Sequence, residues 1–192
     1  MTRINAAAAF KSQQANQFAL ARTIARQRRS KLRRLHAVVL QHRDAIRAAM
    51  AADFHKPLHE VDISEIITLN SEIRHAIRNL PYWMQTERVG VRLPLMGTSA
   101  QIRYEPKGVC LIMGPWNFPF NLNLIPLTAA VAAGNCVIIK PSEHTPHSTA
   151  VLKKIISECF PEEEVAVVEG AVPEAQELLA LPFNHIFFTS SN

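Results

Sequence analysis

Apolar residues in the first 80 positions recur every three or four residues, which is the spacing of one helix face. This pattern predicts a helix over residues 12–50 and another over residues 60–80. Pro81 follows the second helix, and we expect it to end that helix because proline lacks a backbone N–H. The apolar face of the first helix consists of Phe18, Ile24, Leu32, Leu35, Val38, Val39, Ile46 and Met50.

Between residues 88 and 105 the pattern changes to strict alternation, with apolar Val89, Val91, Leu93 and Leu95 separated by polar or small residues. A turn at Gly97-Thr98-Ser99 then leads into the returning segment 101–104. Together they predict a β-hairpin. A two-stranded ribbon is barely stable alone, so we expect it to pack against something else, such as a second subunit.

From residue 108 onward, short continuous apolar runs alternate with helical segments. Such runs are typical of strands buried on both faces of a sheet. The expected strands are 109–113, 136–139, 165–168 and 185–188, and the expected helices are 122–133, 147–159 and 173–180. Alternation at this length predicts an α/β fold with a parallel, Rossmann-like sheet and right-handed crossovers.

The chain therefore divides into an N-terminal helical segment (1–87), a hairpin arm (88–106) and part of a Rossmann-like domain (107–192). Its 192 residues are 48% hydrophobic, which is globular rather than disordered. Three cysteines are too few for a disulfide scaffold, so we expect a reducing, cytoplasmic setting. The most apolar stretch, 124–139, is short and interrupted, and predicts no membrane span.

The net charge of +5 comes from the beginning of the chain, because residues 1–43 hold ten Lys and Arg and no acid. This start lacks the apolar region of a secretory signal, although an Arg-rich organelle transit peptide remains an alternative. The basic run 26–34 permits a nucleic-acid or anionic-membrane surface. We favour a solvated helix face, because no aromatic residues alternate with the charges.

Polar and small residues follow each of the four expected strands, at the edge where open α/β sheets bind ligands. The four junctions are 114–117, 140–143, 169–171 and 189–191. Neither G-x-G-x-x-G nor a Walker A motif is present, so no generic nucleotide motif supports a ligand assignment.

Two of these junctions carry candidate chemistry. Lys140 and Glu143 offer an ammonium donor and a carboxylate acceptor that suit a sugar diol, although an ordinary surface ion pair is the alternative. The side-chain amide of Asn117 offers two donors that suit a developing oxyanion, and the alternative is an asparagine that caps its own turn.

The same residues carry a family resemblance. Residues 108–119 (GVCLIMGPWNFP), 132–135 (AAGN) and 139–143 (IKPSE), followed by 187–189 (FFT), resemble the aldehyde dehydrogenase superfamily in order and spacing. The forms NFPFNL and KPSE are most similar to its class 3 branch, which includes fatty-aldehyde and coniferyl-aldehyde enzymes. The resemblance extends to residues 52–57 and 79–81, and so covers nearly the whole chain.

The resemblance implies a role for each matching position in oxidising an aldehyde to an acid with NAD or NADP. Asn117 would belong to the oxyanion hole, while Lys140 and Glu143 would hold the adenosine ribose. The remaining positions would line the cofactor site, with backbone at Met113, Pro115 and Trp116, a glycine beside the adenine at Gly170 and a serine near the pyrophosphate at Ser191. The arm would join subunits of a homo-oligomer.

Two family features are not found in this sequence. The nucleophilic cysteine and the general-base glutamate lie further along the chain in the family, and none of Cys110, Cys136 and Cys159 resembles that nucleophile. Ser190 stands where the family has a glycine before the helix that faces the pyrophosphate. We therefore expect a fragment of a longer enzyme, inactive by itself, with aldehyde as the substrate of the complete protein.

The sequence leaves two alternative functions open and contains two histidine pairs that could suggest a metal site. One alternative is a non-catalytic module that assembles through the arm, and another is nucleic-acid binding through the basic run, which we do not favour. His55, His59 and Glu60 have a spacing found in metal sites, but Pro57 interrupts the helix that would present them. His144 and His147 flank a proline in the same way, so we expect no metal site.

Overall fold

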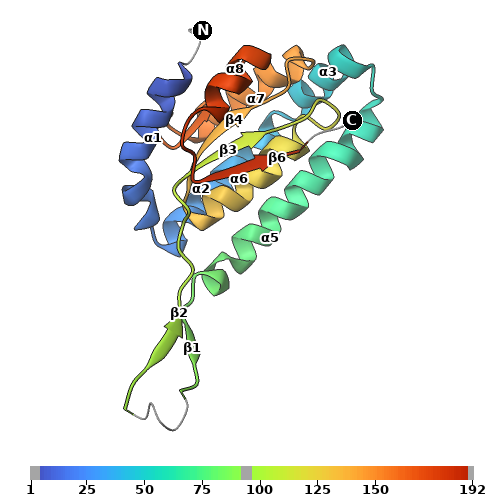
Figure 1. The fold of residues 1–192 in the computed structure, drawn as a ribbon. Helices are drawn as coiled ribbons and strands as arrows, with labels where there is room; N and C mark the ends of the chain where they lie inside the picture. Colours follow the sequence, from blue (N-terminus) through green and yellow to red (C-terminus); the bar gives the residue numbers. More distant parts are fainter. Residues whose placement is uncertain (1–4, 92–96, 190–192) are drawn as a thin grey trace.

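A computed structural model describes residues 5–91 and 97–189 of the chain. Its centre is a four-stranded parallel sheet in the order β5-β4-β3-β6, formed by β3 (Val109–Met113), β4 (Cys136–Lys140), β5 (Val165–Val167) and β6 (His185–Phe188). The register pairs Val109 with Cys136 and Val137 with Val165. The predicted parallel sheet is thus confirmed (Figure 1).

Helices cover both faces of this sheet. Helices α1 (Ala6–Ala21) and α8 (Val172–Leu179) lie on one face, where Leu111 and Ile138 are fully buried. The other face carries α2 (Ala25–Gln41), α6 (Asn121–Ala133) and α7 (Pro146–Cys159), and Ile112 and Ile139 point into that core. Alternate residues of each strand therefore enter two different cores, which explains the unbroken apolar runs.

The connecting helices α6, α7 and α8 begin or end within one residue of the predicted bounds. Helix α6 ends where Gly134 adopts a φ of +88°, the left-handed conformation that glycine accepts without strain. Pro146 occupies the first turn of α7, where its missing N–H removes no helical hydrogen bond.

The single helix predicted over residues 12–50 is wrong, because the structure has α1, α2 and α3 (Arg43–Phe54) in its place. Residues 22–24 leave the helix, and the backbone N–H and hydroxyl of Thr23 both donate to the Leu20 carbonyl. Helices α1 and α2 pack on opposite faces of the sheet, so the chain has to turn between them. The chain turns a second time at His42, between α2 and α3.

The helix predicted over residues 60–80 is present but differs at both ends. It begins with α4 (Leu58–Val61), widens into a π-helical turn η1 (Asp62–Ile67) and continues as α5 (Thr68–Trp83). Pro81 does not end it, because a proline in the last turn removes only one hydrogen bond and the helix continues to Trp83.

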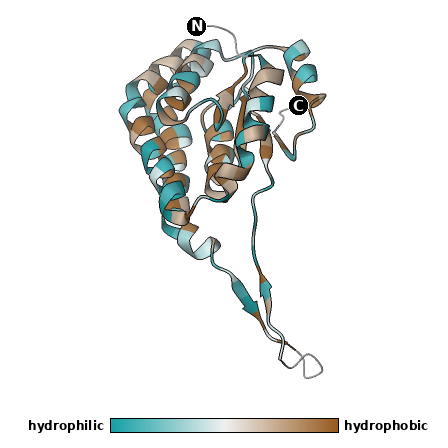
Figure 2. Ribbon diagram, turned by 90° about the vertical axis from the view of Figure 1, so that its left-hand side faces the viewer, coloured by the Kyte–Doolittle hydropathy of each residue, from teal (hydrophilic) through white to brown (hydrophobic). Residues whose placement is uncertain are grey.

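The hairpin is confirmed as an antiparallel pair of β1 (Glu87–Val89) and β2 (Ala100–Ile102). Every residue of the two strands is exposed, and Figures 1 and 2 show the arm projecting away from the layered body. Leu93 and Leu95, which were predicted to continue the alternation, lie outside the described residues. The division into three segments proposed from the sequence stays a prediction.

The basic run is only partly a solvated face. Arg28 is 5% exposed, and its guanidinium donates to the carbonyls of Ala132 (3.1 Å) and Ala133 (2.6 Å) at the end of α6. Lys31 forms an ion pair of 2.6 Å with Glu164. The expectation of a solvated face is therefore wrong for Arg28, which supplies donors to unpaired helix carbonyls. Within the described residues, no helix is both long and apolar enough to cross a bilayer.

Candidate functional site

The carboxyl ends of the four strands lie at one edge of the sheet, because all four strands are parallel. From β3 the chain adds β4 and β5 on one side and then places β6 on the other side of β3. Open α/β sheets bind their ligands at such a reversal of the strand order. Backbone hydrogen bonds continue past the strands, from Gly114 N to Lys140 O and from Thr189 N to Met113 O, both at 3.2 Å.

Lys140 and Glu143 form an ion pair at the end of β4, with 2.8 Å between Nζ and Oε2. The Lys140 side chain is only 8% exposed, whereas that of Glu143 is 35% exposed. The hydrogen bond from Lys140 lowers the pKa of Glu143, so the carboxylate stays ionised at neutral pH. The arrangement presents a donor and an acceptor together, and its buried ammonium distinguishes it from a solvent-exposed surface pair.

Asn117 lies in the turn after β3 and is half-buried. Its Oδ1 accepts a hydrogen bond of 3.1 Å from the Phe118 N–H, which is the kind of contact expected for a turn asparagine. Its Nδ2 donates to none of the residues in the described ranges, and so retains both donors for a ligand. The two interpretations of Asn117 are therefore compatible with each other.

The turn that carries Asn117 packs closely on α6, through a contact that the sequence analysis missed. A Cβ atom at Gly114 would lie 2.3 Å from Oδ1 of Asn123, so only glycine fits there. Asn123 is fully buried and donates 2.8 Å from Nδ2 to the Pro119 carbonyl. A polar residue inside an otherwise apolar helix was the available sequence signal for this role.

Met113, Pro115, Trp116 and Gly170, which were also predicted to line the cofactor site, lie at or just after the ends of β3 and β5. The side chains of Met113 and Pro115 are buried, whereas Trp116 is 45% exposed beside them. Gly170 follows β5 at a φ of +154°, and a Cβ there would lie 2.3 Å from the Glu174 side chain. Ser191 lies outside the described residues.

The segment 53–56 contacts the turn after β3 and the first turn of α7, and sequence reasoning assigned it no role. Asp53 accepts hydrogen bonds from the first backbone N–H groups of α7, including 2.8 Å from Ser148. Phe54 stacks on Trp116 with 6.2 Å between ring centroids. The Lys56 ammonium lies 4.7 Å from the centre of the Phe118 ring. This segment therefore supports the turn of Asn117 from outside.

The three cysteines are buried thiols. Burial raises the pKa of Cys110 to about 11 and those of Cys136 and Cys159 to about 12, so all three stay protonated at neutral pH. Within residues 5–91 and 97–189, no group of three or more His, Cys, Asp or Glu is placed to hold a metal ion.

Comparison with known proteins identifies the family of this chain. A family model described as "Aldehyde dehydrogenase family" matches residues 1–192. The putative aldehyde dehydrogenase AldX of Bacillus subtilis (strain 168) is 44% identical over 182 residues, which are 95% of this chain and 41% of that protein. Human aldehyde dehydrogenase family 3 member B1 is 40% identical over 85% of this chain and 35% of its own length.

A solved structure agrees with these sequences. The substrate-bound state of Staphylococcus aureus AldH superposes with a TM-score of 0.93 at 34% identity. The match covers 96% of this chain and 40% of that one. The chain thus spans about two-fifths of the length of these relatives, and the predicted class 3 similarity is confirmed by family 3 members among them.

Proposed function

This chain belongs to the aldehyde dehydrogenase family, and from that premise we propose that it forms the N-terminal, NAD(P)-binding part of an enzyme that oxidises aldehydes to carboxylic acids. The observation that carries the proposal is the arrangement of the sheet edge. The Lys140–Glu143 pair and the free amide donors of Asn117 lie at the ends of two neighbouring parallel strands.

The cofactor assignment rests on the donor set at the end of β4. Members of the family use NAD(P), which supplies the hydride acceptor when bound. Lys140 would donate to the ribose hydroxyls and Glu143 would accept from them, while Gly170 would lie beside the adenine. An ionised Glu143 disfavours a 2′-phosphate, so we propose a preference for NAD over NADP. Ser191 is proposed for the pyrophosphate.

Asn117 is proposed to donate its amide hydrogens to the oxyanion that forms when a thiolate attacks an aldehyde. The attacking thiolate would not come from this chain, because its three cysteines are buried and protonated. We therefore propose that this chain binds cofactor but does not oxidise aldehyde by itself.

Titration of the purified chain with NAD and with NADP tests the proposal, with Trp116 fluorescence and calorimetry as readouts. We expect saturable NAD binding that Lys140→Met weakens about tenfold or more, because the ribose loses a charged donor. Lys153→Met is the matched control, since Lys153 forms an ion pair with Glu169 at the end of the adjacent strand. Equal losses in the two variants, or no NAD binding, would contradict the proposal.

A second candidate function is assembly through the arm, and the exposure of its apolar residues favours it. Val89 and Ile102 are each 43% exposed and Tyr104 is 74% exposed. We propose that these side chains are covered in a homo-oligomer. Analytical ultracentrifugation should detect oligomers that Ile102→Ser weakens. A chain that sediments as a monomer at high concentration would contradict this assembly role.

A further inference from the structure

Glu65 is a buried carboxyl group that caps a helix to which it does not belong. Its side chain lies in η1 with no exposed surface, and Oε2 accepts a hydrogen bond of 2.7 Å from the backbone N–H of Asn121. Asn121 is the first residue of α6, and the residue before it, Phe120, offers no side-chain acceptor. Glu65 therefore supplies the acceptor that a Ser or Asp cap supplies in other helices.

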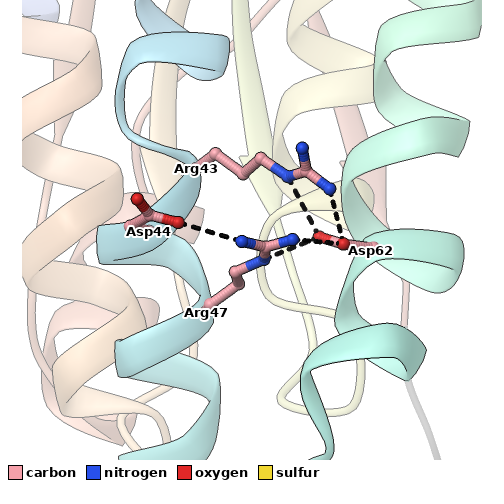
Figure 3. Close-up of polar contacts among 4 residues, drawn as sticks. All are labelled: Arg43, Asp44, Arg47 and Asp62. Atoms are coloured by element: carbon pink, nitrogen blue, oxygen red, sulfur yellow. Dashed lines mark hydrogen bonds and ion pairs between the residues drawn. The ribbon is translucent and has the colours of Figure 1, made fainter.

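The position of Glu65 is fixed from the outer side of η1. Asp62, at the start of η1, is held by two arginines of α3, with 2.6 Å to Arg43 and 2.9 Å to Arg47 (Figure 3). Arg47 also donates 3.0 Å to Asp44 on its own helix. These contacts hold the pKa of Asp62 well below its usual range, so the connection between η1 and α3 persists at neutral pH.

A short series of hydrogen bonds links Glu65 to the turn of Asn117. The Asn121 side chain donates from Nδ2 to the Ser64 carbonyl, which joins η1 and α6 a second time. The Phe118 carbonyl accepts 3.0 Å from Leu122 in the first turn of α6. The Phe118 N–H in turn donates to Oδ1 of Asn117. A movement of the start of α6 would therefore change the direction in which the Asn117 amide points.

Half of the Glu65 carboxyl group lacks a partner. Oε1 is buried and has no hydrogen-bond partner among the described residues. Burial raises the pKa of Glu65 to about 7, against the opposing effects of the Asn121 N–H, the Lys56 charge and the Phe120 N–H. Lys56 lies between α3 and α4 and pairs with Glu60, and α6 carries no ionisable residue.

We propose that Glu65 is a positioning residue for Asn117, which it orients by holding the first turn of α6. The proposal rests on the oxyanion role of Asn117 for its functional meaning, but the positioning itself is a property of the folded chain. A fully buried carboxyl group with one oxygen on a helix end and the other unpaired is costly for stability alone. A positioning role accounts for that cost.

The test uses two-dimensional ¹H–¹⁵N NMR of the full chain between pH 5 and 9. The Asn117 side-chain signals are identified by their loss in Asn117→Ser. We expect these signals and the Asn121 amide to move together through one midpoint near neutral pH. Glu65→Gln, which keeps an acceptor but cannot ionise, should abolish that titration. Glu72→Gln removes an exposed charge from α5 and should leave it unchanged.

A second variant separates capping from charge. Glu65→Met removes the acceptor, and we expect hydrogen exchange of the Asn121 amide to accelerate about tenfold together with a shift of the Asn117 signals. Faster exchange with unmoved Asn117 signals would show a helix cap that positions nothing, and would overturn the proposal. An unchanged titration in Glu65→Gln would overturn it too, even where Glu65→Met does not fold. Neither readout needs NAD or aldehyde, so failure here is separate from failure of the proposed function.

Discussion

The sheet of the body and the hairpin of the arm contain the same secondary structure in opposite surroundings. Ile138 in β4 and Ile102 in β2 both lie in hydrogen-bonded strands, yet Ile138 is fully buried and Ile102 is 43% exposed. The body strand has helices on both of its faces, whereas no second layer covers the arm within the described residues. Strand pairing therefore occurs in both regions, but only in the body do helical layers bury the apolar side chains of the strands.

Charged side chains differ between the two regions in the same way. In the body, the guanidinium of Arg28 and the carboxyl group of Glu65 are buried and each binds the end of α6. In the arm, Glu87 and Arg88 are exposed. Some charged groups of the body are thus part of its internal structure, whereas Glu87 and Arg88 in the arm are hydrated at the surface.

The largest effect is expected from the two isoleucines. Ile138→Ala should lower the free energy of unfolding by about 2–5 kcal/mol, because it leaves a cavity between two helical layers. Ile102→Ala, the same change in the arm, should lower it by less than about 1 kcal/mol. Urea denaturation followed by circular dichroism measures both. Equal losses would mean that the arm is covered as completely as the sheet.

Loss of the buried guanidinium should be the next largest effect. Arg28→Leu leaves the carbonyls of Ala132 and Ala133 without donors, and we expect a loss of about 2–3 kcal/mol in the free energy of unfolding. Arg88→Leu in the arm removes an exposed charge, and we expect no measurable loss in the same denaturation experiment. A stable Arg28→Leu variant would show that water replaces the lost donors.

The third prediction concerns pH. The pKa of Glu65 is raised from 4.5 to about 7 in the folded chain, so its contribution to stability is complete below about pH 4.5. That contribution is lost as pH rises through about 7, and Glu65→Gln should then become more stable than the parent chain by about 1–3 kcal/mol. Thermal unfolding between pH 4.5 and 8 measures this. Glu87→Gln removes an exposed carboxylate from the arm and is the control.

The smallest effect is expected at the ion pairs of Asp62 with Arg43 and Arg47, which are partly buried. Asp62→Asn removes a carboxyl group whose pKa is held well below its usual range. The parent chain should therefore have a higher free energy of unfolding than the variant at neutral pH, and should lose this difference only in strong acid. Added 1 M salt should reduce the difference in urea midpoint only in part, because salt screens partly buried ion pairs less than exposed ones. Arg103 and Glu105 form an exposed ion pair in the arm. Glu105→Gln should leave the urea midpoint unchanged with and without added salt.

The parts of the fold that the sequence predicted are those in which local pattern and burial agree. Strand β3 and residues 136–139 of β4 are unbroken apolar runs because both of their faces are buried, and Gly134 ends α6 because glycine accepts a positive φ. The corner at residues 22–24 was not predictable from periodicity, because helical spacing continues through it. The turn exists because α1 and α2 pack on opposite faces, which is a tertiary requirement.

The candidate site shows the same limit. Asn117, Lys140 and Glu143 could be nominated because strand ends in a parallel sheet share one edge. The supporting residues Glu65 and Lys56 could not, since their contacts join segments that are far apart or depend on a π-helical turn. Arg28 was assigned to a solvated face for a related reason, because its partners are carbonyls about a hundred positions away.

Helix α1 has a consequence for how the polypeptide is made. Gln13 donates 2.8 Å to the Val137 carbonyl, and its fully buried amide lies 124 positions from that partner. At about 5–20 residues per second, a ribosome needs on the order of 10 s to produce β4 after α1 has emerged. During this interval the apolar side of α1 has no sheet to cover. Chaperone contact with α1 is therefore expected during this interval.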